Sequence, residues 1–448
     1  MIKFTGRIFK AVFLISTITI SFCSLSKDIW KSKGYGYVFD LSDSNTPIIY
    51  DITNDYCLRN HFLTEEARRD GISIDKKKGL LDFDKLFPLI VTKLETIPKA
   101  CISKEQKTFQ SDGYVFNAYH TLDILLSNFS YHYAFSDYKD IDWKLLKSHW
   151  LKRVNSETTP EQLQSVIDDF LKTIRDGHAI LFNQFLERVA YYTPRESKSE
   201  KRLRDFLAGT TEFTEISQVY QYVYKRWLKN IESYFAVDSP TQKLADNFLF
   251  AKLKGGGTYF RIDSFDEHGT KKVMEKVTPH FVNSKGLIID LRDSSGGSDL
   301  VALKIMAYLI DQQVRVGSKS FKLSTGMSDK KDIFVFPEID KPFVGKIVVI
   351  SSEQTPSAAE FFLMALKARN HVTIIGENSR GALSDALTKA LPNGWGITIS
   401  NEKYMDERGN NYEFTGIPVE ESFEFPNLLD IEKSRDSALE YAIELITN

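Results

Sequence analysis

Residues 286–301 read GLIIDLRDSSGGSDLV, and this stretch decides the fold class. The run LIID has the length of a buried strand, and the paired glycines after it allow a tight turn. A helical pattern, DLVALKIMAYLID, begins directly after that turn. A strand, a turn and a helix in this order are typical of a β-α-β unit, whose strands pair in parallel.

The same alternation continues on both sides of this stretch. Short apolar runs divided by glycine turns occur at GTYFRIDSF, GKIVVISS, HVTIIGENSRG and WGITIS, and a second helix is expected at SAAEFFLMALKA. From Leu249 onward the chain therefore predicts an α/β domain with substantially parallel pairing. The segment SNEKYMDERGNNYEF further predicts a hairpin around DERGNN.

The N-terminal half has a different texture. The stretch GYGYVFDLSDSNTPIIYDITNDYCL alternates aromatic or branched residues with small polar ones, which predicts a β-hairpin. Apolar residues at three-and-four spacing between Tyr114 and Asp176 predict helices, with Thr159-Pro160 starting the last of them. We divide the chain into a leader (1–23), a hairpin-containing region (28–105), a helical cap region (106–248) and the α/β domain (249–448).

Composition excludes several partners. The chain has 448 residues, and 58 Lys and Arg against 60 Asp and Glu give a net charge of −2. A chain without excess positive charge shows no general attraction for nucleic acid or for anionic membranes. A hydrophobic share of 42% is that of an ordinary globular protein.

The first residues predict export. MIKFTGRIFK carries three positive charges, and AVFLISTITISFC then runs thirteen residues without a charge. This is the pattern of a cleaved secretory leader, and it falls short of the roughly 20 residues that span a bilayer. We expect a periplasmic or cell-envelope protein. A lipid anchor at Cys23 stays open, as does pairing of Cys57 with Cys101.

One serine stands out in EQTPSAAEFFLMALK, residues 353–367. Ser357 is placed at a helix N-terminus, where backbone N–H groups lack partners and stabilise developing negative charge. A nucleophile benefits from that environment. Serine is also a preferred N-cap, so this stretch alone leaves a purely structural role open.

Five motifs in order give this serine a context: DGHAILF, GLIIDLRDSSGGSDLV, TPSAAEFFLMALK, IIGENSRGALSD and LPNGWGITISNEKYMDERGNNYEFTGIPVE. Together they resemble the tail-specific, or C-terminal processing, serine peptidase family, and most closely its branch with the tricorn core and the interphotoreceptor retinoid-binding repeats. The resemblance implies a ClpP/crotonase-like catalytic domain of ββα units. It also implies that Ser357 is the nucleophile.

The resemblance suggests the partners of this serine. The better-known branch uses a lysine base, but Ala382 occupies that place in GENSRGALS, so the Ser/Lys dyad is absent. The other branch uses a histidine and a carboxylate, which correspond to His178 in DGHAILF and Glu413 in YEFTGIP. Gly177 stands where the tricorn type has a serine, which leaves a direct linkage of His178 to Glu413 unsupported.

Acyl transfer also needs donors for the oxyanion. The resemblance implies a backbone N–H of Gly296 or Gly297 and the N–H of Ala358. Glycine lets the backbone approach a substrate, and an N–H at a helix start has no intrahelical partner. Arg380 and Ser384 are weaker candidates for substrate contacts, since structural roles explain them equally well.

The sequence thus predicts an exported serine peptidase that hydrolyses peptide bonds of proteins or peptides through a Ser357 acyl-enzyme. This chemistry requires no metal or organic cofactor. An apolar-ligand or peptide-binding module on the same fold is the alternative, and an acyl-CoA enzyme of the crotonase type is less supported. The helical pattern after His178 does not predict the PDZ domain that many family members use for tail capture. The oligomeric state is not predicted.

Overall fold

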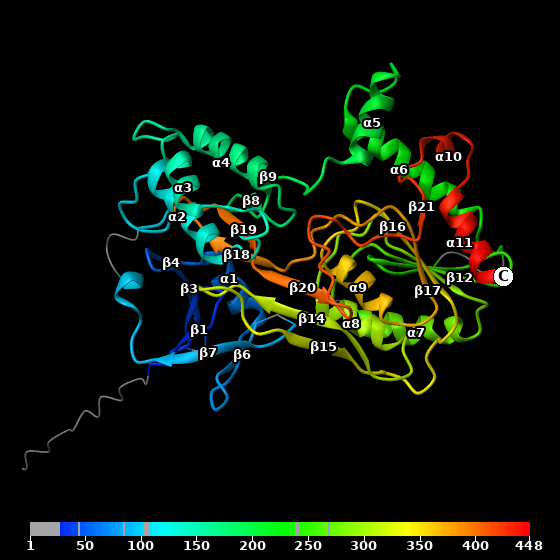
Figure 1. Cartoon of the computed structure of the whole chain (residues 1–448), viewed down its shortest axis with the longest axis horizontal. Helices are drawn as coiled ribbons and strands as arrows, with labels where there is room; N and C mark the ends of the chain where they lie inside the picture. Colours follow the sequence, from blue (N-terminus) through cyan, green and yellow to red (C-terminus); the bar gives the residue numbers. More distant parts are fainter. Residues whose placement is uncertain (1–26, 44, 84–85, 103–106, 238–241, 268) are drawn as a thin grey trace, which may run out of the picture.

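The computed structural model describes residues 27–43, 45–83, 86–102, 107–237, 242–267 and 269–448. The predicted leader and Cys23 lie outside these residues. Figure 1 shows two lobes side by side, with the N-terminal strands and cap helices on the left and a large sheet with its helices on the right. No helix in the described ranges is long and apolar enough to cross a bilayer.

The right-hand lobe contains a seven-stranded sheet. Its order is β10 (Gln242–Ala245), β11 (Phe248–Lys252), β12 (Thr258–Ile262), β13 (Leu287–Asp290), β16 (Ile347–Ser351), β17 (Val372–Gly376) and β21 (Glu421–Ser422). All pairs from β12 to β21 are parallel, whereas β10 and β11 pair antiparallel. The predicted mixed α/β fold with substantially parallel pairing is confirmed.

Helices cover both faces of this sheet, which explains its apolar central strands. Ile289 and Val349 pack with α7 (Thr270–Val282), α8 (Asp299–Ala307) and α9 (Ala358–Lys367). Their neighbours Ile288 and Val348 point to the opposite face and pack with α6 (Ile216–Glu232) and α11 (Ser437–Thr447). Helices α5 (Lys198–Ala208) and α10 (Leu428–Glu432) contact α6. Parallel strands buried on both faces are continuously apolar for this reason.

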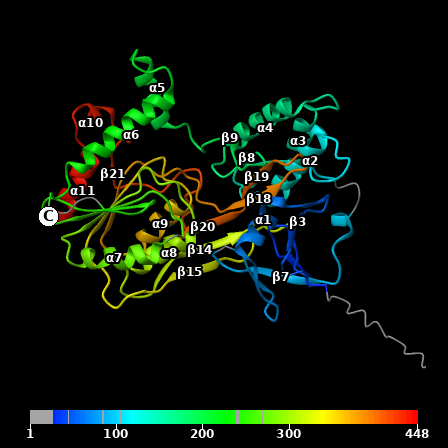
Figure 2. The ribbon, with the colours of Figure 1, turned by 180° about the vertical axis from the view of Figure 1, so that it is seen from behind.

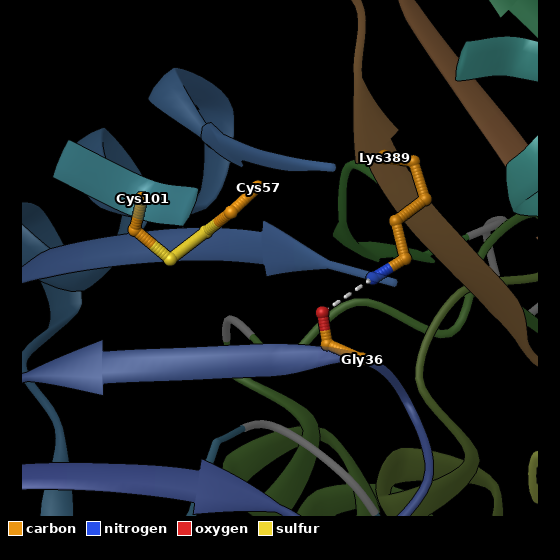
Figure 3. The surroundings of a disulfide bond; sticks show 4 residues. All are labelled: Gly36, Cys57, Cys101 and Lys389. Carbon is orange, nitrogen blue, oxygen red and sulfur yellow. Dashed lines mark hydrogen bonds between the residues drawn. A yellow bond between two sulfur atoms is a disulfide. The ribbon is translucent and has the colours of Figure 1, made fainter. Parts of the chain in front are cut away.

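The left-hand lobe holds a second seven-stranded sheet. Its order is β4 (Cys57–Arg59), β3 (Ile48–Ile52), β2 (Tyr37–Asp40), β1 (Ile29–Ser32), β7 (Leu89–Leu94), β6 (Leu80–Asp82) and β5 (Ser73–Asp75). The expected hairpin is its β2–β3 pair. Helix α1 (His61–Asp70) contacts β3, and a disulfide joins Cys57 to Cys101 in the short helix Lys99–Ile102 (Figure 3).

Two small sheets join the lobes. The cap helices α2 (Ala118–His132), α3 (Trp143–Leu151) and α4 (Pro160–Ile174) precede β8 (Ile180–Phe182) and β9 (Arg188–Tyr191), and they confirm the helical prediction. Strand β8 pairs with β19 (Gly396–Ser400), beside β18 (Ala386–Ala390). Strand β14 (Val314–Phe321) lies between β15 (Lys331–Val335) and β20 (Glu402–Asp406). Figure 2 shows the same bridging strands between the lobes from behind.

The hairpin expected around DERGNN is wrong. Strand β20 pairs with β14 instead, and the chain makes a turn in which the Asp406 carboxylate accepts the N–H groups of Arg408 and Asn410. The following described residues, through Glu413, form no strand. Strand β20 already has its partner, so the returning chain is free to place Glu413 elsewhere.

A buried lysine ties the two lobes together. Lys389 in β18 donates to the carbonyl of Gly36 at 3.2 Å (Figure 3). It also donates to the carbonyl of Tyr35 at 2.6 Å and pairs with Asp51 at 3.2 Å. Both charged side chains are fully buried. Burial lowers the pKa of Lys389 to about 8. A buried pair of this kind is costly to break, because the remaining charge keeps no partner.

We expect Lys389→Met to lower the free energy of unfolding by about 3–5 kcal/mol, since Asp51 would stay buried without its cation. Urea unfolding at pH 7 measures this. Lys201→Met is the matched control, because its pair with Asp205 is exposed, and it should cost less than about 1 kcal/mol. Equal losses in the two variants would contradict the bridging role of Lys389.

Candidate active site

Ser357 occupies a strained turn between β16 and α9. Its φ of 55° lies in the left-handed region, which a residue with a side chain rarely adopts. Its N–H donates to the Ala382 carbonyl at 2.8 Å. The side chain is half-buried and faces a large cleft. Such a turn places a serine hydroxyl at the start of a helix, in the open.

A buried glutamate holds this turn. Glu360, in the first turn of α9, accepts hydrogen bonds from the Ser379 hydroxyl (2.6 Å) and from the N–H groups of Gly381 (2.7 Å), Ala382 (2.8 Å) and Ser357 (3.2 Å). Burial raises its pKa, and these donors oppose that shift. The Glu360 carboxylate thus joins the Ser357 turn to the loop at residues 379–382.

The predicted oxyanion donors lie at the same place. Gly296 has a φ of 81°, and a Cβ there would stand 3.0 Å from the Ser357 Cβ and 3.6 Å from the Ala358 nitrogen. At Gly297, with a φ of 140°, a Cβ would stand 2.7 Å from the Phe265 carbonyl. Both positions therefore need glycine, and the backbone of the Gly turn approaches the serine closely.

The cleft beside Ser357 has a volume of about 1200 Å³ and lies between the lobes. Residues of the N-terminal lobe such as Tyr37 and Phe83 form one wall, and Phe265 and Gly297 contribute to the other. Ser384 also lines it, although its hydroxyl donates to the Asp385 carbonyl and accepts the Glu402 N–H.

Arg380 is not among the residues that line the Ser357 cleft within the described chain. It lines a second cleft of about 530 Å³ between helices α5 and α6 and the loop at Glu353. Burial lowers the pKa of its guanidinium. The two weaker candidates for substrate contacts, Arg380 and Ser384, therefore lie in different clefts.

His178 precedes β8, as the sequence predicts, and is buried. A Cβ on its neighbour Gly177 would stand 2.4 Å from the Cβ of Ala382, the residue whose carbonyl binds the Ser357 N–H. Burial lowers the pKa of His178, which favours the neutral imidazole that a general base requires. The hydrogen bonds of the described residues include none between its ring and Ser357.

Glu413 is buried beside the same loop. Its Oε2 accepts the N–H groups of Leu383 (2.9 Å) and Ser384 (2.7 Å), which line the cleft. Burial, followed by the charges of Asp176 and Glu360, raises its pKa well above the usual range. The carboxylate group contacts the cleft wall, and no described hydrogen bond joins it directly to His178.

Two further residues belong to this arrangement and were missed in the sequence. Glu360 could have been found, because Ser357 and Glu360 have the spacing of a capping box. The Asp176 carboxylate accepts hydrogen bonds from the backbone N–H of His178 at 2.9 Å and from the Ser400 hydroxyl at 2.6 Å. The Asp-Gly turn before His178 is a local signal for Asp176, but no spacing indicates its contact with Ser400, which is 224 residues away.

The class that the geometry supports is a mixed α/β protein with a serine and a glycine turn at one cleft and a buried histidine beside the adjoining loop. Residues 257–421 match the sequence family described as "Peptidase family S41". This match confirms the resemblance to serine-type peptidases that the motifs indicate.

A curated relative is the "Carboxy-terminal processing protease CtpA" of Bacillus subtilis strain 168. It is 25% identical over 168 residues, which cover 37% of this chain and 35% of the relative. The chain thus matches about a third of the length of that protein.

Solved structures support the fold. A crystal structure from Parabacteroides merdae, provisionally classed as a peptidase, has a TM-score of 0.61 at 21% identity and covers 75% of this chain and 98% of its own. Mature CPAF has a TM-score of 0.52 at 14% identity and covers 74% and 96%. At these identities the likeness concerns the fold alone, and it extends over both lobes.

We expect Glu360→Ala to lower the free energy of unfolding by about 2–5 kcal/mol, because three donors would lose their acceptor in a buried place. Urea unfolding measures this. Glu200→Ala is the control, since its exposed pair with Arg204 on α5 should contribute only a few tenths of a kcal/mol. A loss no larger than that of the control would show that Glu360 does not hold the turn.

We expect the stability of the folded protein to depend on pH through Asp299. Burial, then the charge of Asp385, raises its pKa to about 7. The folded state therefore keeps a proton between about pH 4 and pH 7 that the unfolded state loses, and stability falls as the pH rises through that window. We expect Asp299→Asn to raise the free energy of unfolding by about 1–3 kcal/mol at pH 8 and to leave it nearly unchanged at pH 4. Denaturation at both pH values tests this, and equal gains at both would contradict it.

Proposed function

We propose that this chain is an exported serine peptidase that hydrolyses peptide bonds in proteins or peptides. The observation that carries the proposal is the strained Ser357 turn, with the Gly296 backbone against it, at the wall of a cleft of about 1200 Å³. The S41 match of residues 257–421 supports the reaction class.

In the proposed mechanism, the Ser357 hydroxyl attacks the scissile carbonyl and His178 accepts its proton. The N–H groups of Ala358 and of Gly296 or Gly297 stabilise the oxyanion. His178 then gives the proton to the leaving amine, and water hydrolyses the acyl-enzyme by the reverse proton path. Glu413 is the carboxyl member that orients the base.

The compartment is part of the proposal. A leader pattern at the N-terminus predicts export, and the disulfide between Cys57 and Cys101 supports it. Disulfides persist in oxidising compartments and are rare in the cytosol. Both observations favour the periplasm or the cell envelope, and lipidation of Cys23 remains a prediction from the sequence.

The substrate is expected to be an extended peptide. The cleft runs between two lobes, and its walls come from segments of both, so a chain can pass along it. The relative from Bacillus subtilis is named a carboxy-terminal processing protease. Cleavage near C-termini is therefore the first specificity to examine for this chain.

We expect Ser357→Ala to lower peptide cleavage by at least about 1000-fold and His178→Ala by a similar factor, since a triad acts as a unit. Digestion of an unfolded-peptide mixture, read by mass spectrometry, measures both. Ser298→Ala, a serine on the same cleft wall, should keep at least about a tenth of the activity. New termini near C-terminal ends would indicate tail processing, whereas internal cuts would indicate an endopeptidase.

Two results would contradict the peptidase proposal. Full cleavage by Ser357→Ala would exclude this serine as the nucleophile. No cleavage by the folded parent, together with a retained peptide or apolar ligand, would favour the binding module instead.

A further inference from the structure

Four buried polar atoms gather behind His178 without hydrogen-bond partners. They are the His178 Nδ1, the Asp176 Oδ2, the Glu413 Oε1 and the Tyr133 hydroxyl. Packing brings their segments together, because Gly177, between Asp176 and His178, packs against Ala382, and Glu413 binds the N–H groups of the two residues that follow Ala382. Buried polar atoms are rarely left without partners, and their concentration at one place indicates a function.

The two carboxyl groups of this cluster are arranged alike. The Asp176 Oδ1 accepts hydrogen bonds from the backbone N–H of His178 and from the hydroxyl of Ser400. The Glu413 Oε2 is occupied by two backbone N–H groups of the cleft wall. Each carboxyl group therefore has one oxygen that accepts two hydrogen bonds and one oxygen that accepts none.

Two ionised carboxylates in one buried place repel each other strongly, so the pair holds one proton. Burial and the neighbouring charges of Asp176 and Glu360 raise the pKa of Glu413 well above its usual range. This shift favours the protonated form of Glu413. Its Oε1 is the available position, because Oε2 accepts two N–H groups.

We propose that Asp176 is the positioning residue that carries the negative charge behind His178, and that Glu413 stays protonated and donates its Oε1 proton to the Asp176 Oδ2. This inference rests on the proposed function, but it moves the negative charge of the triad from Glu413 to Asp176, so that Glu413 acts through Asp176 and not on His178 directly.

The proton balance of the reaction is consistent with this assignment. When His178 accepts the Ser357 proton on Nε2, it becomes an imidazolium. The carboxyl pair keeps its one proton and its one negative charge, which stabilises that imidazolium. The imidazolium then gives its proton to the leaving amine, and the pair is unchanged at the end of the step.

Other charges face this cluster and are the same in every variant below. Lys139 faces both carboxyl groups and lies 4.0 Å from the centre of the Phe414 ring. Arg188 and Arg380 lower the pKa of His178, and Asp385 raises it. Glu360 acts on Glu413 from α9. A change between variants therefore reports on the substituted carboxyl group.

The test compares two isosteric substitutions in the mature protein. Asp176→Asn keeps an oxygen that accepts the Ser400 hydroxyl but removes the charge. Glu413→Gln keeps an oxygen for the two N–H groups and places an amide donor where the shared proton stood. We expect Asp176→Asn to lower kcat/KM by at least about 100-fold and Glu413→Gln by less than about tenfold.

The pH profile separates positioning from a structural effect. Removal of a negative charge near His178 lowers the pKa of its imidazole, so Asp176→Asn should move the acid limb of kcat/KM to lower pH by about one unit. Glu413→Gln should leave that limb nearly in place. A larger activity loss or limb shift in Glu413→Gln, or equal effects of both, would overturn the assignment.

A second measurement does not depend on activity. In a Ser357→Ala background, the His178 ring is titrated by NMR, with its signal assigned through His178→Gln. A larger drop in the His178 pKa on Asp176→Asn than on Glu413→Gln supports the assignment, and the reverse order overturns it. If the parent cleaves no peptide, the proposed function fails while this titration still decides the charge.

Ser400→Ala is the matched control. It removes a hydrogen bond to the same Asp176 oxygen without changing any charge. We expect a smaller activity loss and a smaller pKa change than with Asp176→Asn. An effect of Ser400→Ala as large as that of Asp176→Asn would show that hydrogen bonding, and not the charge of Asp176, positions the histidine.

Discussion

The buried carboxylate of Glu360 is the constraint on which the site depends. It binds the Ser357 N–H on one side and three donors of the loop at 379–382 on the other. A residue with a side chain at a φ of 55° needs surroundings that determine its conformation. The same loop continues to Leu383 and Ser384, whose N–H groups bind Glu413. Glu360 therefore connects the Ser357 turn with Glu413.

The second constraint is the join between the lobes. The cleft beside Ser357 takes walls from both, so its shape depends on how the N-terminal sheet sits on β18. Lys389 fixes that position through two carbonyls and Asp51. Strand β8 pairs with β19 in the same region, and this pairing brings His178 from the cap region to the catalytic domain. Structural bonds between regions therefore assemble the site.

Much of the fold could be predicted because its signals are local. The alternation of LIID, a glycine turn and an apolar helix indicates parallel strands, and the cap helices are evident from their spacing. The hairpin around DERGNN failed because local turn chemistry predicts a turn at Asp406 but not which strand pairs with β20. That pairing is with β14, some 80 residues earlier in the chain. The Ser400 partner of Asp176 is also remote, 224 residues along the chain.

The sequence by itself determined the resemblance to a peptidase family, the candidate serine, and the residue types available for acid–base chemistry, because these depend on motifs of a few adjacent residues. Only the tertiary structure decided that Arg380 and Ser384 line different clefts, and that the charge of Asp176 acts on both His178 and Glu413. The physical reason is that burial and neighbouring charge set the protonation of a carboxyl group, and neither is defined until segments more than 200 residues apart are packed together.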